Sequence, residues 1–178
     1  MKKPILMPLV TIAVAAAMLL GASIGLQSIG NAKAQSEHLR IMRTILPDST
    51  DFVVEPYAGD DANIRSVHKA DNGFVVETVV AGYAGDIRMM VGVSIEGTVT
   101  GLVVMEMTET FGLGAEALTD YVFLAQLLNT SGEAEVGTNV DAITGATVTS
   151  KAVVRSVNSA VAFVTGADTE SSATSWGG

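Results

Sequence analysis

The chain has 178 residues and no cysteine, and it carries 19 acidic against 10 basic residues. The lack of cysteine excludes disulfides, cysteine-ligated iron–sulfur clusters and CxxCH haem attachment. All three basic residues of the first 34 stand in a segment without acids, which leaves 7 basic against 19 acidic side chains in the rest. Such acidity disfavours nucleic acid as a partner. His38 and His68 have no neighbouring ligand cluster, so no metal site is expected.

The first 34 residues predict an N-terminal membrane anchor. Lys2 and Lys3 precede a stretch without charge until Lys33, and its core from Ile5 to Leu26 is almost wholly apolar. About 20 such residues span a bilayer as a helix, and the lysine pair favours a cytoplasmic N-terminus with the rest outside. A signal peptide is the alternative, because Ala32-Lys33-Ala34 resembles a cleavage site. The apolar stretch is longer than the roughly 7–15 residues usual for such signals, so a retained anchor is favoured.

Residues 35–65 are interpreted as a linker with one short amphipathic helix. From Ser36 to Leu46, apolar residues recur on one side of a helix, and Pro47 follows to end it. The folded domain is predicted at 66–166, and it begins with two β-hairpins, each with a Gly-containing turn between apolar runs. The turns are Asp71-Asn72-Gly73 and Glu96-Gly97, and the strands are expected at 66–70, 74–80, 89–95 and 99–107.

Two helices complete the predicted domain. The first is expected from about Ala115 to Leu128, and its core-facing residues are predicted to be Leu118, Val122, Ala125 and Leu128. The second follows Thr149 or Ser150 as N-cap and ends at Gly166. Its apolar stripe is Val153, Val154, Val157, Ala160, Val161 and Val164.

Antiparallel hairpins packed with helices define an α+β fold class behind one transmembrane helix. Residues 167–178 are rich in Ser, Thr, Gly and Ala and predict a disordered tail.

The motif from Asp141 to Ser150 precedes the second helix and reads Asp-Ala-Ile-Thr-Gly-Ala-Thr-Val-Thr-Ser. Thr147 is therefore expected in a loop just before a helix N-terminus, where unpaired N–H groups and the helix dipole suit a phosphate. Gly145 and Ala146 leave the approach free of bulk. From these residues alone, an ordinary capping loop without a ligand is an equal alternative. Asp141 is then most simply a turn residue that hydrogen-bonds its own backbone.

Four segments together resemble the FMN-binding domain family. They are Gly82-Tyr83-Ala84-Gly85-Asp86-Ile87, the hairpin at Gly92–Gly97, the stretch Glu109–Gly114 and the motif at Asp141–Ser150. With one N-terminal anchor, the chain is most similar to the G subunits of Rnf-type, ion-translocating ferredoxin:NAD oxidoreductase complexes. The C subunits of Na⁺-pumping NADH:quinone reductases are the near alternative.

The resemblance implies covalently bound FMN. In that family a flavin transferase attaches FMN from FAD to a threonine hydroxyl as a phosphoester, and the matching position here is Thr147. Asp141 would take part in transferase recognition. Phe111 stands where the family usually has proline, so the fixed φ of proline is lost. The remaining cofactor contacts that the resemblance implies are Thr144, Gly145, Ala146, Thr149 and Ser150 around the phosphate, and Glu109, Thr110, Gly112, Leu113 and Gly114 near the flavin.

The resemblance further implies a membrane-anchored electron-transfer subunit rather than a stand-alone enzyme, with no catalytic acid or base. Its partners would be the other membrane subunits of the redox complex and, during maturation, the flavin transferase. Two other classes stay open: an independent extracytoplasmic flavin carrier, and a flavin-free assembly or scaffold subunit.

Overall fold

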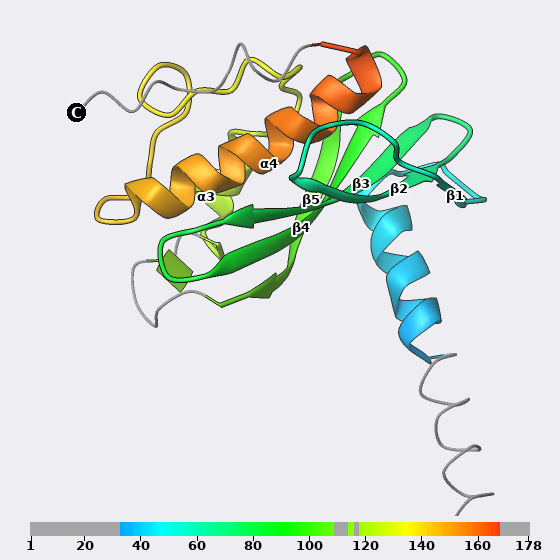
Figure 1. The fold of residues 1–178 in the computed structure, drawn as a ribbon, viewed down its shortest axis with the longest axis horizontal. Helices are drawn as coiled ribbons and strands as arrows, with labels where there is room; N and C mark the ends of the chain where they lie inside the picture. Colours follow the sequence, from blue (N-terminus) through cyan, green and yellow to red (C-terminus); the bar gives the residue numbers. More distant parts are fainter. Residues whose placement is uncertain (1–32, 109–113, 116–117, 168–178) are drawn as a thin grey trace, which may run out of the picture. The chain divides into compact units, whose positions relative to one another are not determined.

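The computed structural model describes residues 33–108, 114–115 and 118–167 (Figure 1). The chain divides into two units, Met1–Arg40 and Ile41–Gly178, and residues 33–40 are the described part of the first. These residues are helical, and Arg40 pairs with Glu37 one turn away. The predicted anchor core and the predicted disordered tail from 168 onward lie outside the described residues. Within the described ranges, the structure contains no helix with the length and apolar character needed to cross a bilayer.

An antiparallel sheet of five strands forms the centre of the second unit, and its strands neighbour one another in chain order (Figure 1). The predicted α+β architecture is confirmed, as are both hairpins, which are β2–β3 and β4–β5. A short edge strand, β1, was not predicted. The strands are β1 (Val53–Glu55), β2 (Ile64–Lys69), β3 (Gly73–Ala81), β4 (Asp86–Ser94) and β5 (Val99–Met107).

Helix α4 (Thr147–Thr165) covers one face of the sheet, packing on β3 and β4. The predicted apolar stripe is confirmed: its residues are buried, except Val164, which is partly buried. Successive strand residues point to opposite faces, so alternate residues of β3 and β4, such as Val76 and Val91, meet this helix in the core. Gly166 ends α4 in the left-handed conformation, with φ 68°, as expected of a C-terminal glycine.

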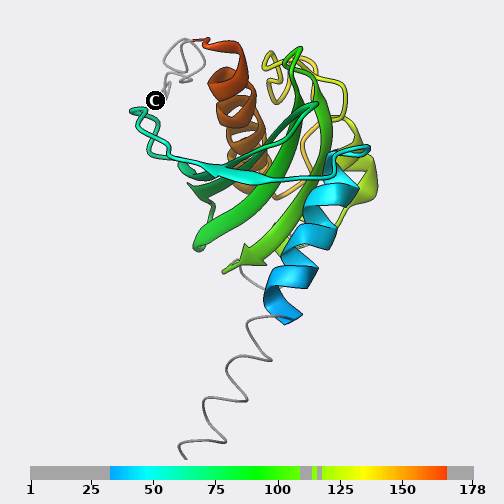
Figure 2. The same cartoon turned by 90° about the vertical axis from the view of Figure 1, so that its right-hand side faces the viewer.

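The other face of the sheet receives the end of the helical segment 33–45, from Ile41 onward (Figure 2). Gly92 and Gly101 are cross-strand partners there. A Cβ on Gly92 would lie 2.4 Å from the Ile45 carbonyl oxygen, and one on Gly101 would lie 2.7 Å from that oxygen. Thr100 Oγ1 donates to the same carbonyl at 2.6 Å. The paired glycines thus let the chain backbone lie directly on the sheet.

The predicted helix from Ala115 to Leu128 is wrong in both extent and orientation. Residues 114–115 are helical, Leu118 and Thr119 form a turn, and α3 spans only Tyr121–Ala125. Asp120 restarts the helix, because its side chain accepts from Val122 N at 2.8 Å and Phe123 N at 2.9 Å. Because a new helix begins after Asp120, a different side of it packs against the core. Leu118 is buried as predicted, but Phe123 and Leu127 are buried in place of Val122, Ala125 and Leu128.

Candidate functional site

Thr147 is the first residue of α4 rather than a residue of the preceding loop. The helix starts four residues earlier than Lys151 because the Thr-Val-Thr-Ser segment is itself helical. Ala146 is the N-cap and supplies no side-chain hydrogen bond, and the first turn contains no acidic residue. The predicted caps Thr149 and Ser150 are therefore wrong. A 19-residue helix thus presents an N-terminus without a side-chain cap, where backbone N–H groups and the dipole favour an anion.

A tight turn carries the chain into this helix. Ala146 N donates to Ile143 O at 2.9 Å, and Gly145 between them has φ 81°, a conformation that glycine adopts without steric cost. Ser150 Oγ accepts from Ile143 N at 3.2 Å. Ser150 is fully buried. Its hydroxyl therefore fixes the turn to α4 rather than reaching the surface.

Burial separates the hydroxyls of the motif into two groups. Thr144 and Thr147 are exposed, together with Gly145 between them. Thr149 and Ser150 are buried, and so is Ala146. Thr149 Oγ1 has no hydrogen-bond partner among the residues that the structure describes. Thr147 is thus the exposed hydroxyl on the first turn of α4, with a buried, unsatisfied hydroxyl two residues further along the helix.

Side-chain amides hold the loop that leads to the motif. Asn139 Oδ1 accepts from Glu135 N at 2.7 Å, and its Nδ2 donates to Glu133 O at 2.8 Å. The buried Asn158 of α4 donates to Ala134 O at 2.8 Å. Gln126, which follows α3, is paired in both directions with the backbone of Asp141: Asp141 N donates to Gln126 Oε1 at 2.8 Å, and Gln126 Nε2 donates to Asp141 O at 3.3 Å.

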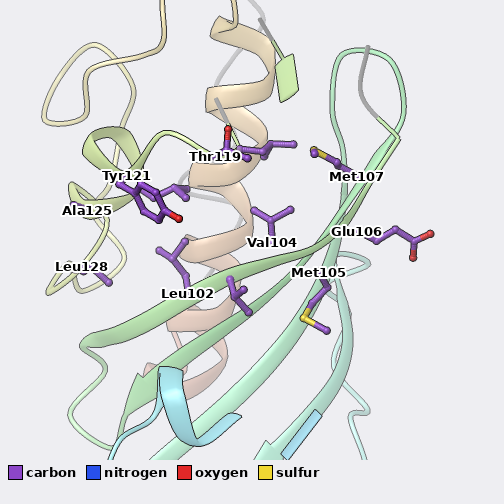
Figure 3. Close-up of a pocket in the computed structure, with 12 residues that line it drawn as sticks. Leu102, Val104, Met105, Glu106, Met107, Thr119, Tyr121, Ala125 and Leu128 are labelled. Atoms are coloured by element: carbon purple, nitrogen blue, oxygen red, sulfur yellow. The ribbon is translucent and has the colours of Figure 1, made fainter. Parts of the chain in front are cut away.

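An apolar cavity of about 580 Å³ lies between β5 and the α3 region (Figure 3). Leu102 and Val104 of β5 face Tyr121 across it, whereas Glu106 points away. Tyr121 is 88% exposed, so a large aromatic surface is open to the solvent there. The full lining is Leu102, Val103, Val104, Met105, Glu106, Met107, Leu118, Thr119, Tyr121, Leu124, Ala125 and Leu128.

The predicted flavin contacts Glu109, Thr110, Gly112 and Leu113 lie outside the described residues, and Gly114 is helical and half-buried. The cavity is lined by Met107, which precedes that stretch in the sequence, and by Leu118, which follows it.

The sequence analysis did not identify two residues of the site, Gln126 and Tyr121. Asp120 as an N-cap was the signal that would have predicted a new helix with Tyr121 at its first position. No cluster of three or more His, Cys, Asp or Glu side chains that could hold a metal occurs in the described ranges.

The fold and this site define a class of protein, and comparison with known proteins gives the class its name. Residues 82–162 match the FMN-binding domain, a span that includes the sheet from β4 onward, the cavity, the motif and most of α4. The family match supports FMN as the cofactor. The matched region begins at Gly82, in the loop between the two hairpins.

Individual relatives show which group of FMN-binding proteins the chain is similar to. The G subunit of the ion-translocating oxidoreductase complex of Methanosarcina acetivorans is 38% identical over 139 residues, which are 69% of this chain and 72% of that protein. The chain belongs to this family of G subunits. The G subunit of the Na⁺-translocating ferredoxin:NAD⁺ oxidoreductase complex of Acetobacterium woodii is 37% identical over 50% of this chain. The G subunit of the proton-translocating ferredoxin:NAD⁺ oxidoreductase complex of Clostridium ljungdahlii is 37% identical over 52%. The matches span 47% and 53% of these last two relatives.

Proposed function

We propose that the chain is a membrane-anchored flavoprotein subunit that carries FMN covalently on Thr147. It would relay electrons within an ion-translocating ferredoxin:NAD oxidoreductase complex. Its relatives include subunits of a Na⁺-translocating and of a proton-translocating complex, so family membership alone does not choose the coupling ion.

The observation that carries the proposal is the uncapped N-terminus of α4 with Thr147 at its first position. A phosphate esterified to Thr147 Oγ would lie beside the N–H groups of the first turn, which have no intrahelical acceptors. The helix dipole and the absence of acids in that turn favour its negative charge. Thr149, two residues along the same turn, has a buried Oγ1 without a partner among the described residues. An orphaned hydroxyl of this kind costs free energy unless a ligand or water satisfies it.

Attachment would follow from ordinary phosphoryl chemistry. Thr147 Oγ1 would form a new bond to the FMN-side phosphorus of FAD, the pyrophosphate P–O bond would break, and AMP would leave. The hydroxyl proton would pass to a base of the flavin transferase. Because Thr147 and Gly145 are exposed, the transferase can reach the hydroxyl without unfolding α4. The other motif hydroxyl at the surface, Thr144, lies outside the helix and lacks the first-turn N–H groups.

The cavity between β5 and the α3 region is the proposed site for the flavin ring. Its apolar walls suit a flat aromatic ring system, and its volume of about 580 Å³ lies within the usual range for ligand pockets. The link between Gln126 and Asp141 joins the helix that lines the cavity to the loop that carries the attachment motif. The phosphate and the ring of a single FMN molecule would therefore contact neighbouring elements, the loop before α4 and the α3 region.

FMN, when bound, supplies the redox chemistry. The residues of the protein would position and partly desolvate the ring, and hydrogen bonds and burial set its potential. An ester bond would keep the cofactor from being lost. The residues 1–34 would anchor the domain at the membrane surface, with the N-terminus cytoplasmic and the FMN domain extracytoplasmic. There it would exchange electrons with other subunits of the complex.

The test compares wild type with Thr147→Ala by in-gel flavin fluorescence after denaturing electrophoresis, in a host with an active flavin transferase. We expect a fluorescent wild-type band and a dark Thr147→Ala band. Thr138→Ala, which removes an exposed hydroxyl of the loop before the motif, is the matched control and should keep the fluorescence. A dark wild-type band, in a host whose transferase attaches flavin to a known acceptor protein, would contradict the proposal. It would favour the assembly or scaffold subunit. Covalent flavin in a protein that is active without partner subunits would favour the independent electron carrier.

A further inference from the structure

The carboxamide of Gln126 forms a reciprocal pair with one residue's backbone in the attachment motif. Its Oε1 accepts from Asp141 N at 2.8 Å and its Nε2 donates to Asp141 O at 3.3 Å. The two contacts require one acceptor atom and one donor atom in the same group, and the carboxamide provides both. Gln126 itself is tied to α3, because its backbone N donates to Phe123 O at 3.1 Å. Phe123 is buried in the core, so this end of the pair is firmly held.

The pair acts at the first residue of the motif, and a second fixed point follows at Ile143. There the backbone N–H donates to the buried Ser150 Oγ. The exposed residues Thr144 and Gly145 lie between Ile143 and α4. The chain entering the acceptor turn is therefore held from α3 at Asp141 and from α4 at Ile143, and these two anchors together set where the turn begins.

We propose that Gln126 is a positioning residue for flavin attachment, which holds the acceptor turn in the conformation that the transferase recognises. The proposal rests on the proposed function at Thr147. Without the pair, Asp141 would sample other conformations, and the transferase would bind only the fraction of molecules with the correct one. A binding-competent fraction below one raises the apparent dissociation constant by the same factor. The loss should therefore appear in the KM for the acceptor protein, while kcat changes little.

The first experiment measures the geometry in the flavin-free full chain, so it does not depend on attachment. The protein is made in a host without transferase and held in detergent, and amide hydrogen exchange is followed by NMR. We expect Asp141 N–H to be protected in wild type and to lose its protection in Gln126→Ala. Asn139→Ala, which also removes two hydrogen bonds of a side-chain amide to the same loop, should leave Asp141 N–H protected.

Gln126→Glu supplies a conservative variant that keeps one of the two hydrogen bonds. Its carboxylate retains an acceptor oxygen for Asp141 N but has no donor for the Asp141 carbonyl oxygen. At pH 7, protection of Asp141 N–H in Gln126→Glu should therefore lie between that of wild type and that of Gln126→Ala.

The second experiment measures flavin transfer from FAD by purified transferase to each full-length variant. We expect kcat/KM to fall by about tenfold for Gln126→Ala, a loss that corresponds to two lost hydrogen bonds. The fall should come from a higher KM, with kcat little changed. Attachment in Asn139→Ala should stay close to wild type. Equal losses in both variants, or a loss carried by kcat alone, would overturn the positioning role. If wild type itself is not modified while Asp141 N–H shows the expected protection, the proposed function fails and the geometry of the pair stands.

Discussion

At the residue scale, the surroundings of each hydroxyl decide what it can do. The motif contains several hydroxyl residues of similar chemistry, yet only Thr147 is both exposed and on the first turn of α4. Ser150 is buried and accepts from Ile143 N. Thr149 is buried, and its Oγ1 is unsatisfied within the described part of the chain. The family resemblance implies that all of these residues lie around a phosphate. The structure shows that Ser150 also holds the turn.

Replacing Thr149 by the isosteric valine tests whether its hydroxyl is a structural requirement. A buried hydroxyl without a partner costs about 1–3 kcal/mol of stability, so Thr149→Val should leave the melting temperature of the flavin-free protein unchanged or raise it. Attachment should remain at Thr147. Differential scanning fluorimetry of the flavin-free full chain checks the first expectation. A melting temperature that falls by several degrees would mean that the hydroxyl has a stabilising partner in the folded protein.

At the element scale, the predictions succeeded where a local pattern determines an element. Both hairpins follow from Gly-containing turns, and in the second turn Gly97 adopts φ 83°. Helix α4 follows from a long apolar stripe against the sheet. The prediction of α3 failed because helical periodicity was extended across Asp120, whose side chain caps a new helix. Val122 is 78% exposed as a result. The strand β1 was missed because three residues with exposed Val53 and Val54 have no periodic pattern.

The amide contacts of the site could not be predicted from local patterns. Gln126 and Asp141 meet because α3 and the loop before α4 lie next to each other in the folded domain. Nothing in the local sequence of either residue specifies the other. The cavity depends in the same way on the pairing of β4 with β5 and on the placement of α3 beside that edge.

The cap at Asp120 is expected to control α3 and, through it, one wall of the cavity. Asp120→Ala removes two hydrogen bonds to the first turn, a change that costs about 1 kcal/mol or about 3 °C in melting temperature for a domain of this size. Asp120→Asn keeps an acceptor oxygen and should lose less. In flavin-loaded protein, we expect lower fluorescence anisotropy of the flavin in Asp120→Ala than in Asp120→Asn. Identical anisotropy in the two variants would mean that α3 does not confine the ring.

At the scale of the whole molecule, an acidic domain follows a basic, apolar N-terminal segment. The first 34 residues contain three basic and no acidic residues, whereas the rest contains 7 basic and 19 acidic residues. An acidic surface is repelled by anionic lipid, so we expect membrane attachment to depend on the N-terminal segment alone. The domain would then be tethered to the membrane by that segment without binding the lipid surface itself.

Extraction of membranes tests that organisation. If the segment is a retained anchor of about 20 apolar residues, the full chain should stay in the membrane pellet after washing with alkaline carbonate. A variant that lacks residues 1–32 should appear in the supernatant. N-terminal sequencing of the membrane-bound protein separates the two interpretations of the segment. A mature protein that begins near Gln35 and is released by carbonate would identify a cleaved signal peptide and contradict the anchor.

If FMN is esterified to Thr147, mass spectrometry of the flavin peptide should locate the flavin on that residue. Cleavage after Glu135 and Lys151 releases the peptide Val136–Lys151, which contains every hydroxyl of the motif. We predict that fragmentation places the flavin phosphate on Thr147. Flavin on Thr149, Thr144 or Thr138, or a peptide without flavin from a host with active transferase, would show that Thr147 does not carry the cofactor.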